Sequence, residues 1–360
     1  MFGVSHDLAE KLISKMISSN REEVKYCNLC GSGQYRILFQ VGSQRPLTSI
    51  ICSSCGLTRL LETLPKDKLE NIGKHGGSLV RGLEMSRGLK ALYFQNQLLK
   101  SKSIINYLTQ YIGPLKGKRA LDLISETGGF VQALNNQGCM AEGIDLSSQS
   151  EFGISKGLTI HRSHILDFNP NKKYDIITGV RFINHFSDIK AVMKKLKSLL
   201  SKQGVIYFET LDIEHALRRK SLVKCIKADH PYMFTQESFK ALCAKTGFKL
   251  INIERDSDAV TDFSSLNHIH TLITHQTSAD NKYKINISHQ YEKLTSAHIA
   301  YLSSSVDSLD YLNSHSLKRT ISFRIRKVLS LMKLEVPILN LKYHIQAYIK
   351  FRRTLRGRKG

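Results

Sequence analysis

The sequence predicts an α/β protein with a doubly wound, mainly parallel sheet, preceded by a small cysteine module and followed by a basic helical extension. Two observations carry this prediction. Short apolar segments alternate with helical segments between residues 115 and 275, and two Cys-x-x-Cys pairs precede this region. Such alternation favours a parallel sheet with helices on both faces. The expected parts are a helix and zinc module at 1–65, a helical connector at 66–114, the α/β domain at 115–275 and the extension at 276–360.

Apolar segments of strand length mark the expected sheet. We expect strands at 120–124, 140–145, 158–161, 174–179, 204–209, 248–254 and 268–274, and helices at 84–112, 129–137, 147–156, 188–200 and 236–246. The last two strands follow one another without a helix, which indicates an antiparallel hairpin at the sheet edge. Further helices are expected at 1–22 and 318–351, with helices or a linker at 280–317.

The charge of the chain is large and uneven. The formal net charge is +23, and residues 318–360 hold 13 of the 53 Lys and Arg residues against a single acid, Glu335. A basic amphipathic extension favours an anionic partner, such as a membrane surface or nucleic acid, unless it packs on its own domain. No apolar run approaches the roughly 20 residues that span a bilayer. The N-terminus lacks the pattern of a secretory signal, so we expect a cytoplasmic protein with possible peripheral contact of the tail with an anionic membrane.

Four of the seven cysteines form two pairs. Cys27 and Cys30 make the first Cys-x-x-Cys turn, and Cys52 and Cys55 the second, each followed by glycine. Tetrahedral Zn²⁺ is commonly held by four thiolates from two such turns, and four cysteines leave no open position for a substrate. The sequence therefore predicts a structural zinc site. Cys139, Cys225 and Cys243 are scattered and are expected to be buried core residues.

A second group of residues lies where strands of the α/β domain end. Asp122, Thr127, Gly128 and Gly129 lie where the first expected strand passes into its helix, at the position where open α/β sheets bind nucleotides. Two further candidate binding positions lie at the ends of the next two expected strands. The first is Asp145 with Leu146, and the second is Asp167. An acid at the end of the second strand can accept both hydroxyls of a ribose, and Asp167 can accept an adenine amino group.

These three groups of residues, at this spacing, resemble the cofactor-binding positions of class I S-adenosylmethionine-dependent methyltransferases over residues 115–275. Leu121, Asp122, Gly128 and Phe130 match the family's LDxGxGxGxF motif. Ile124 and Glu126 replace its first two glycines, so we expect the loop to bend differently or the pocket to be wider. The resemblance implies a methyltransferase fold that binds S-adenosylmethionine through Asp122, Thr127, Gly128, Gly129, Asp145, Leu146 and Asp167.

The cysteine module placed before such a domain resembles sugar C-methyltransferases, which act on nucleotide-linked sugars. Those enzymes carry an acid-His stretch after the fifth strand, and Asp229 and His230 match its outline. The resemblance implies that His230 is the catalytic base and that Asp229 orients it and raises its basicity. Lys227 stands where an aromatic hydroxyl is expected, so O-methylation is as plausible as C-methylation. His185 follows the fourth strand. We expect it to be structural or to pack against the bound cofactor.

Two other functions remain open on the sequence alone. Some RNA methyltransferases also combine a zinc module with a methyltransferase domain. The positive net charge of the chain favours that alternative. The altered glycine loop favours a non-catalytic binding protein that keeps the fold. The first expectation is methyl transfer to a sugar, nucleotide-sugar or glycan acceptor, with S-adenosylmethionine and zinc as cofactors and nucleic acid a less favoured partner.

Overall fold

The computed structural model describes residues 21–41, 46–69, 86–218, 225–256, 268–276 and 286–303. The helix expected at 318–351 lies outside these ranges, and so does the helix expected at 1–22, apart from its last two residues. Between 280 and 317 the structure describes one helix, α11 (Ile287–Ser303). No helix in the described part of the chain is both long and apolar enough to cross a membrane.

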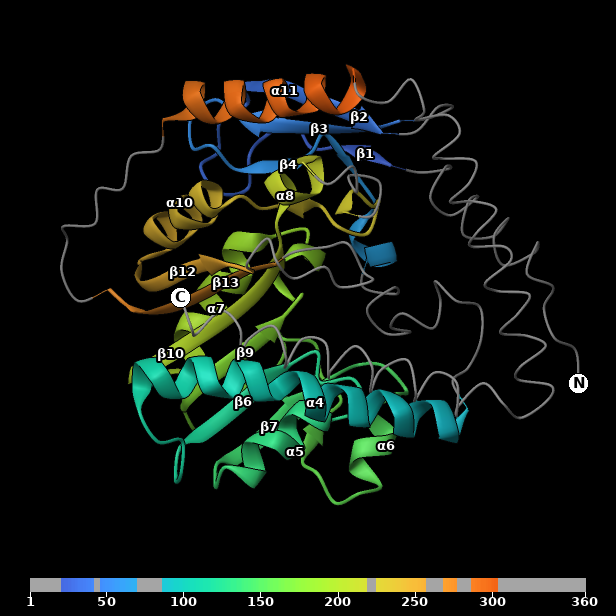
Figure 1. Ribbon diagram of the computed structural model, residues 1–360, viewed down its shortest axis with the longest axis vertical. Helices are drawn as coiled ribbons and strands as arrows, with labels where there is room; N and C mark the ends of the chain where they lie inside the picture. Colours follow the sequence, from blue (N-terminus) through green and yellow to red (C-terminus); the bar gives the residue numbers. More distant parts are fainter. Residues whose placement is uncertain are drawn as a thin grey trace, which may run out of the picture.

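A seven-stranded sheet forms the centre of the molecule (Figure 1). In spatial order its strands are β12 (Phe248–Arg255), β13 (His268–His275), β10 (Leu200–Leu211), β9 (Tyr174–Val180), β6 (Arg119–Leu123), β7 (Met140–Ile144) and β8 (Ile160–His161). The strands from β10 to β8 are parallel to one another, and β13 runs antiparallel to both β10 and β12. The predicted mainly parallel sheet with an antiparallel edge hairpin is confirmed.

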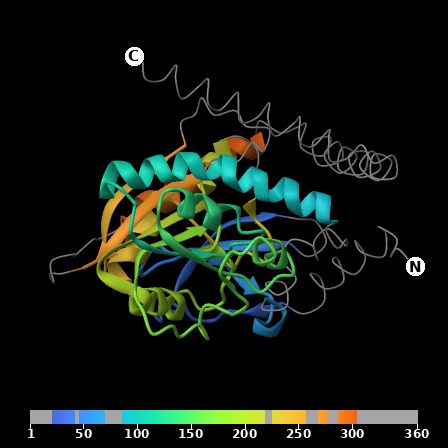
Figure 2. The same ribbon diagram turned by 90° about the horizontal axis from the view of Figure 1, so that it is seen from below.

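Helices cover both faces of this sheet (Figures 1 and 2). One face carries α4 (Arg87–Ile112) and α5 (Gly129–Asn136), and α6 (Ser150–Ile154) packs against α4. The other face carries α7 (Ile189–Leu199) and α10 (Gln236–Thr246). The chain marks the ends of α10 chemically, because Thr235 and Ser238 form a capping box and Gly247 ends the helix with φ 74°.

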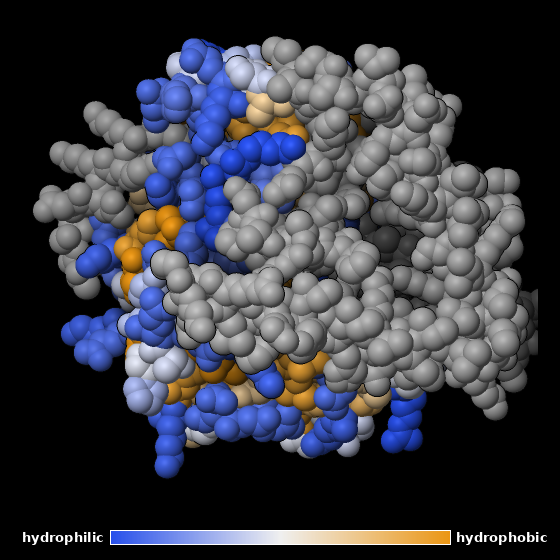
Figure 3. All heavy atoms as spheres, in the orientation of Figure 1, coloured by the Kyte–Doolittle hydropathy of each residue, from blue (hydrophilic) through white to orange (hydrophobic). Residues whose placement is uncertain are grey.

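The alternation of side chains along β10 supplies both halves of the core. Val205 and Tyr207 join the cluster under α4 and α5, whereas Ile206 and Phe208 join the cluster under α7 and α10. Each of these side chains is at most 4% exposed. Strands buried on both faces are what an interior position in a parallel sheet requires. The described surface in Figure 3 is mainly hydrophilic, with separate hydrophobic patches.

The cysteine module has its own antiparallel sheet. One strand of that sheet comes from the α/β domain, from the segment between β10 and β12. β2 (Tyr35–Val41), β3 (Leu47–Cys52) and β4 (Thr58–Leu60) form three of its strands, and the fourth is β11 (Tyr232–Met233). A separate two-stranded sheet pairs β1 (Glu22–Glu23) with β5 (Glu62–Thr63). α11 and α8 (Ile213–Arg218) pack beside the module at the upper end of Figure 1.

The backbone pairing of β11 with β4 joins the module to the segment that contains His230. The N–H of Leu60 donates to the carbonyl of Pro231 at 2.8 Å, and the hydroxyl of Thr58 donates to the carbonyl of Met233. Cys27, Cys52 and Cys55 also belong to the hydrophobic cluster that lies under α7 and α10. The expected boundary at residue 65 stays a prediction about folding units, since in space the module and the domain share a sheet and a core.

Replacing Gly129 by Ala should lower stability, because a Cβ there would lie 2.4 Å from the backbone oxygen of Phe94 and 2.6 Å from Cβ of Gln97. We expect the free energy of unfolding to fall by about 1–3 kcal/mol, the usual cost of an overpacked contact. Denaturant unfolding followed by circular dichroism measures the change. Gln137→Ala, at an exposed residue that ends the same helix, is the control. Equal stability of the two variants would show that α4 tolerates the added methyl group.

Candidate functional site

The loop between β6 and α5 adopts the backbone conformation that glycine normally supplies. Ile124 has φ 55°, Glu126 has φ 49° and Gly128 has φ 84°. The expectation that the non-glycine residues would make this loop bend differently is therefore corrected, because both take the left-handed conformation. For a residue with a Cβ this costs roughly 1–2 kcal/mol, and more for a β-branched side chain. Backbone strain of this kind persists where the surrounding structure enforces it, often at functional sites.

Hydrogen bonds from the neighbouring strand enforce the loop. The N–H of Ser125 donates to the carbonyl of Ile144 at 3.1 Å, and the N–H of Glu126 donates to Oδ2 of Asp145 at 2.8 Å. The other carboxylate oxygen of Asp145 accepts from the N–H and the hydroxyl of Ser147, at 2.6 and 2.5 Å. Asp145 thus fixes the loop and the end of β7 together, in addition to its expected contact with a ribose.

Gln97 on α4 is a second organiser of the loop, and the sequence analysis missed it. Its Oε1 accepts from the hydroxyl of Thr127 at 2.6 Å and from the N–H of Gly129 at 2.9 Å. Its Nε2 donates to the carbonyl of Ser125 and to the carboxylate of Glu126, both at 3.2 Å. Gln97 lies in the polar stretch Gln95-Asn96-Gln97, which carries no distinct signal of this role. α4 therefore supports the cofactor loop directly instead of only connecting two modules.

The two acids expected to bind the cofactor are buried. Asp122 is 3% exposed and Asp145 is 5% exposed. Burial raises the pKa of Asp122 to about 8, although the hydroxyl of Thr178 donates to its carboxyl group at 2.7 Å. Burial also raises the pKa of Asp145 to about 6, against the effect of its hydrogen bonds. A positively charged ligand beside these carboxyl groups would stabilise their ionised forms.

One feature of the loop fits S-adenosylmethionine. The hydroxyl of Ser125 is buried and has no hydrogen-bond partner among the described residues, so a polar ligand can satisfy it. Gly128 and Gly143 are needed for packing within the protein, since a Cβ would lie 2.8 Å from the side chain of Ile160 and 2.5 Å from the hydroxyl of Ser125 respectively. The loop residues and Asp145 thus come together as expected, with half-buried Leu146 next to them. Asp167 is exposed, and its N–H donates to His164 in the turn after β8.

His185, Asp229 and His230 form a second cluster. His185 ends the short helix η1 (Ile183–His185) after β9, and its ring centroid lies 4.5 Å from that of His230. One donor atom from each of the three side chains lies within 4.8 Å of the others. His185 was expected to be structural or to contact the cofactor, and the fold brings it against His230. The convergence of two segments 45 residues apart had no signal in the sequence.

Asp229 raises the pKa of His230, as expected, but its effect is the smaller one. Burial and then the neighbouring His185 lower the pKa of His230 to about 3, which outweighs the opposite effect of Asp229. Burial also lowers the pKa of His185. The positive charges of Arg181 and Lys227 add to this effect at His185. Both basic side chains are exposed at this end of the sheet, and Arg181 has φ 51°.

A separate network of histidines and acids ties the edge hairpin to β10. Asp256 accepts from His268 at 3.2 Å and is 2.8 Å from Nε2 of His270, whose Nδ1 lies 2.7 Å from the hydroxyl of Tyr207. Nε2 of His268 is 3.9 Å from the carboxylate of Glu209. This network had no signal in the sequence, because its members come from β10, from β13 and from the residue that follows β12. It fixes the ends of β10, β12 and β13 to one another.

The four paired cysteines converge in the other module. Cys27 Sγ lies 3.6 Å from Cys55 Sγ, Cys30 Sγ lies 3.5 Å from Cys52 Sγ, and all four sulfurs are within 4.8 Å of one another. Thiolates bound tetrahedrally to Zn²⁺ at about 2.3 Å are about 3.8 Å apart, so these spacings suit that ion. Gly31 and Gly56 have φ 79° and 71° and close the two turns. Cys139, Cys225 and Cys243 are buried, as expected.

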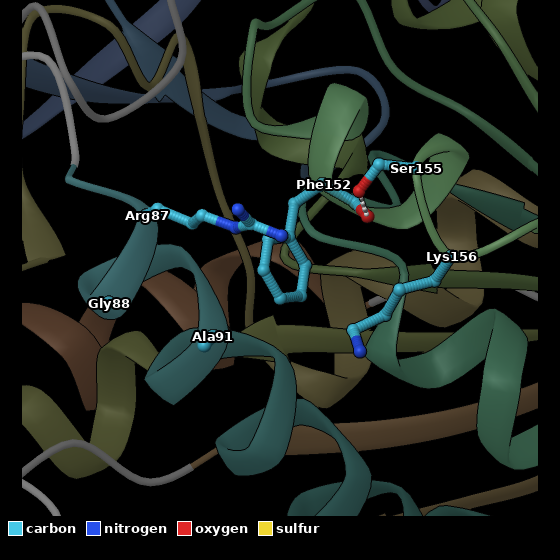
Figure 4. A pocket seen from close by; sticks show the side chains of 6 residues that line it. All are labelled: Arg87, Gly88, Ala91, Phe152, Ser155 and Lys156. Carbon is cyan, nitrogen blue, oxygen red and sulfur yellow. Dashed lines mark hydrogen bonds between the residues drawn. The ribbon is translucent and has the colours of Figure 1, made fainter.

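A surface pocket of about 520 Å³ lies between the start of α4 and the end of α6 (Figure 4). Arg87 and Lys156 extend beside the ring of Phe152, and Nζ of Lys156 is 5.2 Å from the centre of that ring. The remaining lining comes from Gly88, Ala91 and Ser155. None of the expected cofactor or catalytic residues lines this pocket, so it lies outside the site described above.

The fold and the loop define an open α/β domain with a nucleotide-type cofactor site at the carboxyl ends of its strands. Residues 95–253 match the family model described as a methyltransferase domain. The chain therefore contains a class I S-adenosylmethionine-dependent methyltransferase domain. The match begins inside α4 and includes the loop, Asp145 and the segment with Asp229 and His230.

Two curated relatives illustrate the range of similar proteins. A ubiquinone biosynthesis O-methyltransferase of Haemophilus ducreyi is 28% identical over 120 residues, which are 30% of this chain and 51% of that protein. A 23S rRNA (cytidine-2′-O)-methyltransferase of Campylobacter jejuni is 26% identical over 204 residues, which are 53% of this chain and 78% of that protein. The chain thus spans about half the length of the ubiquinone-pathway relatives it matches.

Two solved structures are similar to this chain at low sequence identity. The magnesium protoporphyrin IX methyltransferase of Synechocystis with bound S-adenosylhomocysteine is 14% identical, with a TM-score of 0.40, and the match covers 50% of this chain and 84% of that one. A methyltransferase of Clostridium acetobutylicum is 16% identical, with a TM-score of 0.38, and the match covers 58% and 98%.

Asp122→Asn should stabilise the cofactor-free protein more at pH 8 than at pH 5. The unfolded chain releases the proton of Asp122 near pH 4, whereas burial lets the folded protein hold it to about pH 8. The folded state binds the extra proton across this window, so the wild type loses stability as pH rises and the variant does not. Thermal melts at pH 5, 6.5 and 8 measure the difference. Asp167→Asn, at an exposed carboxylate, is the control, and a difference that does not grow with pH would contradict the prediction.

Proposed function

We propose that the chain transfers the methyl group of S-adenosylmethionine to a hydroxyl oxygen of its acceptor. One observation carries the proposal: the strained loop from Ile124 to Gly128, which Asp145 and Gln97 fix, lies inside a matched methyltransferase domain. A protein that had lost cofactor binding would have no reason to retain this strain. This argues against the non-catalytic alternative.

Different residues around the loop are proposed to bind different parts of the cofactor. Asp122, with a carboxyl group that ionises more readily beside a cation, suits the ammonium end, and Asp145 suits the ribose. Thr127, Gly128 and Gly129 are proposed to contact the cofactor between these two ends. When bound, the cofactor supplies an electrophilic methyl group on a sulfonium. Leu146 and Asp167 remain proposed contacts to the adenosine part.

Two observations support an oxygen acceptor. Lys227 occupies the position of the hydroxyl that the C-methylating enzymes use, and both curated relatives carry O-methylation in their names. An acceptor hydroxyl has to lose its proton during transfer, and we assign that step to the cluster of His185, Asp229 and His230. The cluster lies beside the cations Arg181 and Lys227, which favours an acceptor with negative charge.

A nucleotide-linked sugar or an anionic glycan is our first candidate for that acceptor. The cysteine module and the Asp229-His230 pair are the features that this candidate rests on. RNA is the second candidate, because the rRNA methyltransferase relative matches 53% of the chain and RNA also presents hydroxyls beside phosphates. Labelled cofactor incubated with pools of nucleotide sugars, glycans and RNA separates the two candidates by which pool takes the label.

Asp145→Ala should weaken S-adenosylmethionine binding by about 1.5–3 kcal/mol, because it removes charge-assisted hydrogen bonds. The same change frees the N–H groups of Glu126 and Ser147, so the loop loses its anchor as well as a ligand contact. Isothermal titration calorimetry measures the affinity, and Asp67→Ala, at an exposed acid just after the cysteine module, serves as the control. Absence of heat with the wild type at millimolar cofactor would contradict the proposed function itself.

We also propose that the four paired cysteines hold one structural Zn²⁺. Cys52→Ser should reduce bound zinc from about one to well below half an equivalent per chain and expose the module to proteolysis, while the α/β domain stays folded. Because β11 pairs with β4, we expect the loosening to reach residues 231–234 as well. Metal analysis with limited proteolysis measures both effects, with Cys139→Ser as the control. Wild-type protein without zinc would refute this assignment.

A further inference from the structure

We propose that His185, Asp229 and His230 form a binding site for a divalent transition-metal ion beside the acceptor. The site is distinct from the four cysteines, which lie in the other module. Its part in turnover rests on the proposed function, whereas ion binding itself rests on the geometry of the three side chains.

The donor atoms are nearly in place for an ion. All three lie within 4.8 Å of one another. Two ligands at about 2.0–2.2 Å from the same ion are at most about 4.4 Å apart, so small side-chain rotations complete the site. Nδ1 of His230 has no hydrogen-bond partner among the described residues, although the residue is only 7% exposed. A buried nitrogen of this kind normally has a partner, and an ion would provide one.

The backbone presents these side chains from fixed positions. The N–H of His185 donates to the carbonyl of Phe182 at 3.3 Å, and the N–H of His230 donates to the carbonyl of Lys227 at 3.0 Å. The hydroxyl of Tyr232 donates to the carbonyl of Ser187 at 2.7 Å, which ties the two segments together. Little ordering is therefore needed when an ion enters.

The ligand set indicates the kind of ion and how firmly it is held. Two imidazoles and one carboxylate suit Mn²⁺, Fe²⁺, Co²⁺ or Zn²⁺ and leave open positions for another ligand. Asp229 supplies a single negative charge, and the exposed cations Arg181 and Lys227 lie close enough to act on His185. The ion is therefore exchangeable, in contrast to zinc held by four thiolates.

An ion at this position would lower the pKa of an acceptor hydroxyl placed at one of its open positions. The hydroxyl proton would leave to water, and the oxygen would form its bond to the methyl carbon. The bond from that carbon to sulfur breaks at the same time, and its electron pair stays on sulfur as a neutral thioether. His185 and His230 then act as ligands and not as proton acceptors, which suits the burial of His230.

Titration of the full-length, zinc-replete protein with Mn²⁺ tests the site. Mn²⁺ prefers oxygen and nitrogen ligands, so it does not replace zinc at the cysteines. Electron paramagnetic resonance of free Mn²⁺ reports how much is bound, and no cofactor or acceptor is present. We expect about one Mn²⁺ per chain. Asp229→Asn, which keeps the size of the side chain, should weaken binding by about tenfold or more through loss of the charged ligand.

His230→Ala and His185→Ala should weaken Mn²⁺ binding in the same way, while His289→Ala, at an exposed histidine of α11, should leave it unchanged. Wild-type protein that binds no Mn²⁺, or Asp229→Asn protein that binds it as the wild type does, would overturn the inference. A parallel calorimetric titration with S-adenosylmethionine keeps the two proposals apart. Cofactor binding without Mn²⁺ binding refutes only the metal site, and the reverse result refutes only the proposed function.

Discussion

The pairing of β11 with β4 is the constraint on which the cluster of His185, Asp229 and His230 depends. Tyr232 and Met233 pair with Arg59 and Thr58, directly after the segment that presents His230. The side chain of Tyr232 and that of Asn28 both donate to the carbonyl of Ser187, just beyond His185. The cysteine module therefore holds both histidine segments, although none of its own residues belongs to the cluster. Its role in the molecule is to position the cluster.

The two ends of the site have opposite electrostatic character. Asp122 and Asp145 lie buried where the positively charged cofactor is proposed to bind, and the pKa of each is raised by that burial. Arg181 and Lys227 lie at the other end, near His185. A cationic methyl donor and an anionic acceptor would each meet complementary charge. Such an arrangement orders the two ligands without a large apolar cleft.

Much of the fold followed from the sequence because strands, helices and caps are local. Helix α10 has the predicted bounds, since Thr235 and Gly247 mark its ends chemically. The left-handed conformation of Ile124 did not follow, because intrinsic preference opposes it and only contacts distant in sequence enforce it. β11 was missed because two residues carry no periodicity. The meeting of His185 with His230 depends on tertiary structure alone.

The pairing of β11 with β4 also limits when the sheet of the cysteine module can be completed during synthesis of the chain. Thr58 and Met233, which share a hydrogen bond across it, are 175 residues apart in the chain. Closing so long a loop is entropically costly, and contacts of this kind generally form late in folding. A chain emerging from the ribosome can shape its cysteine turns early, yet the fourth strand of that sheet arrives only after most of the α/β domain has been made. The residues of the loop from Ile124 to Gly128 are therefore made before those of the histidine cluster, and a chain that ends before residue 229 would have the first without the second.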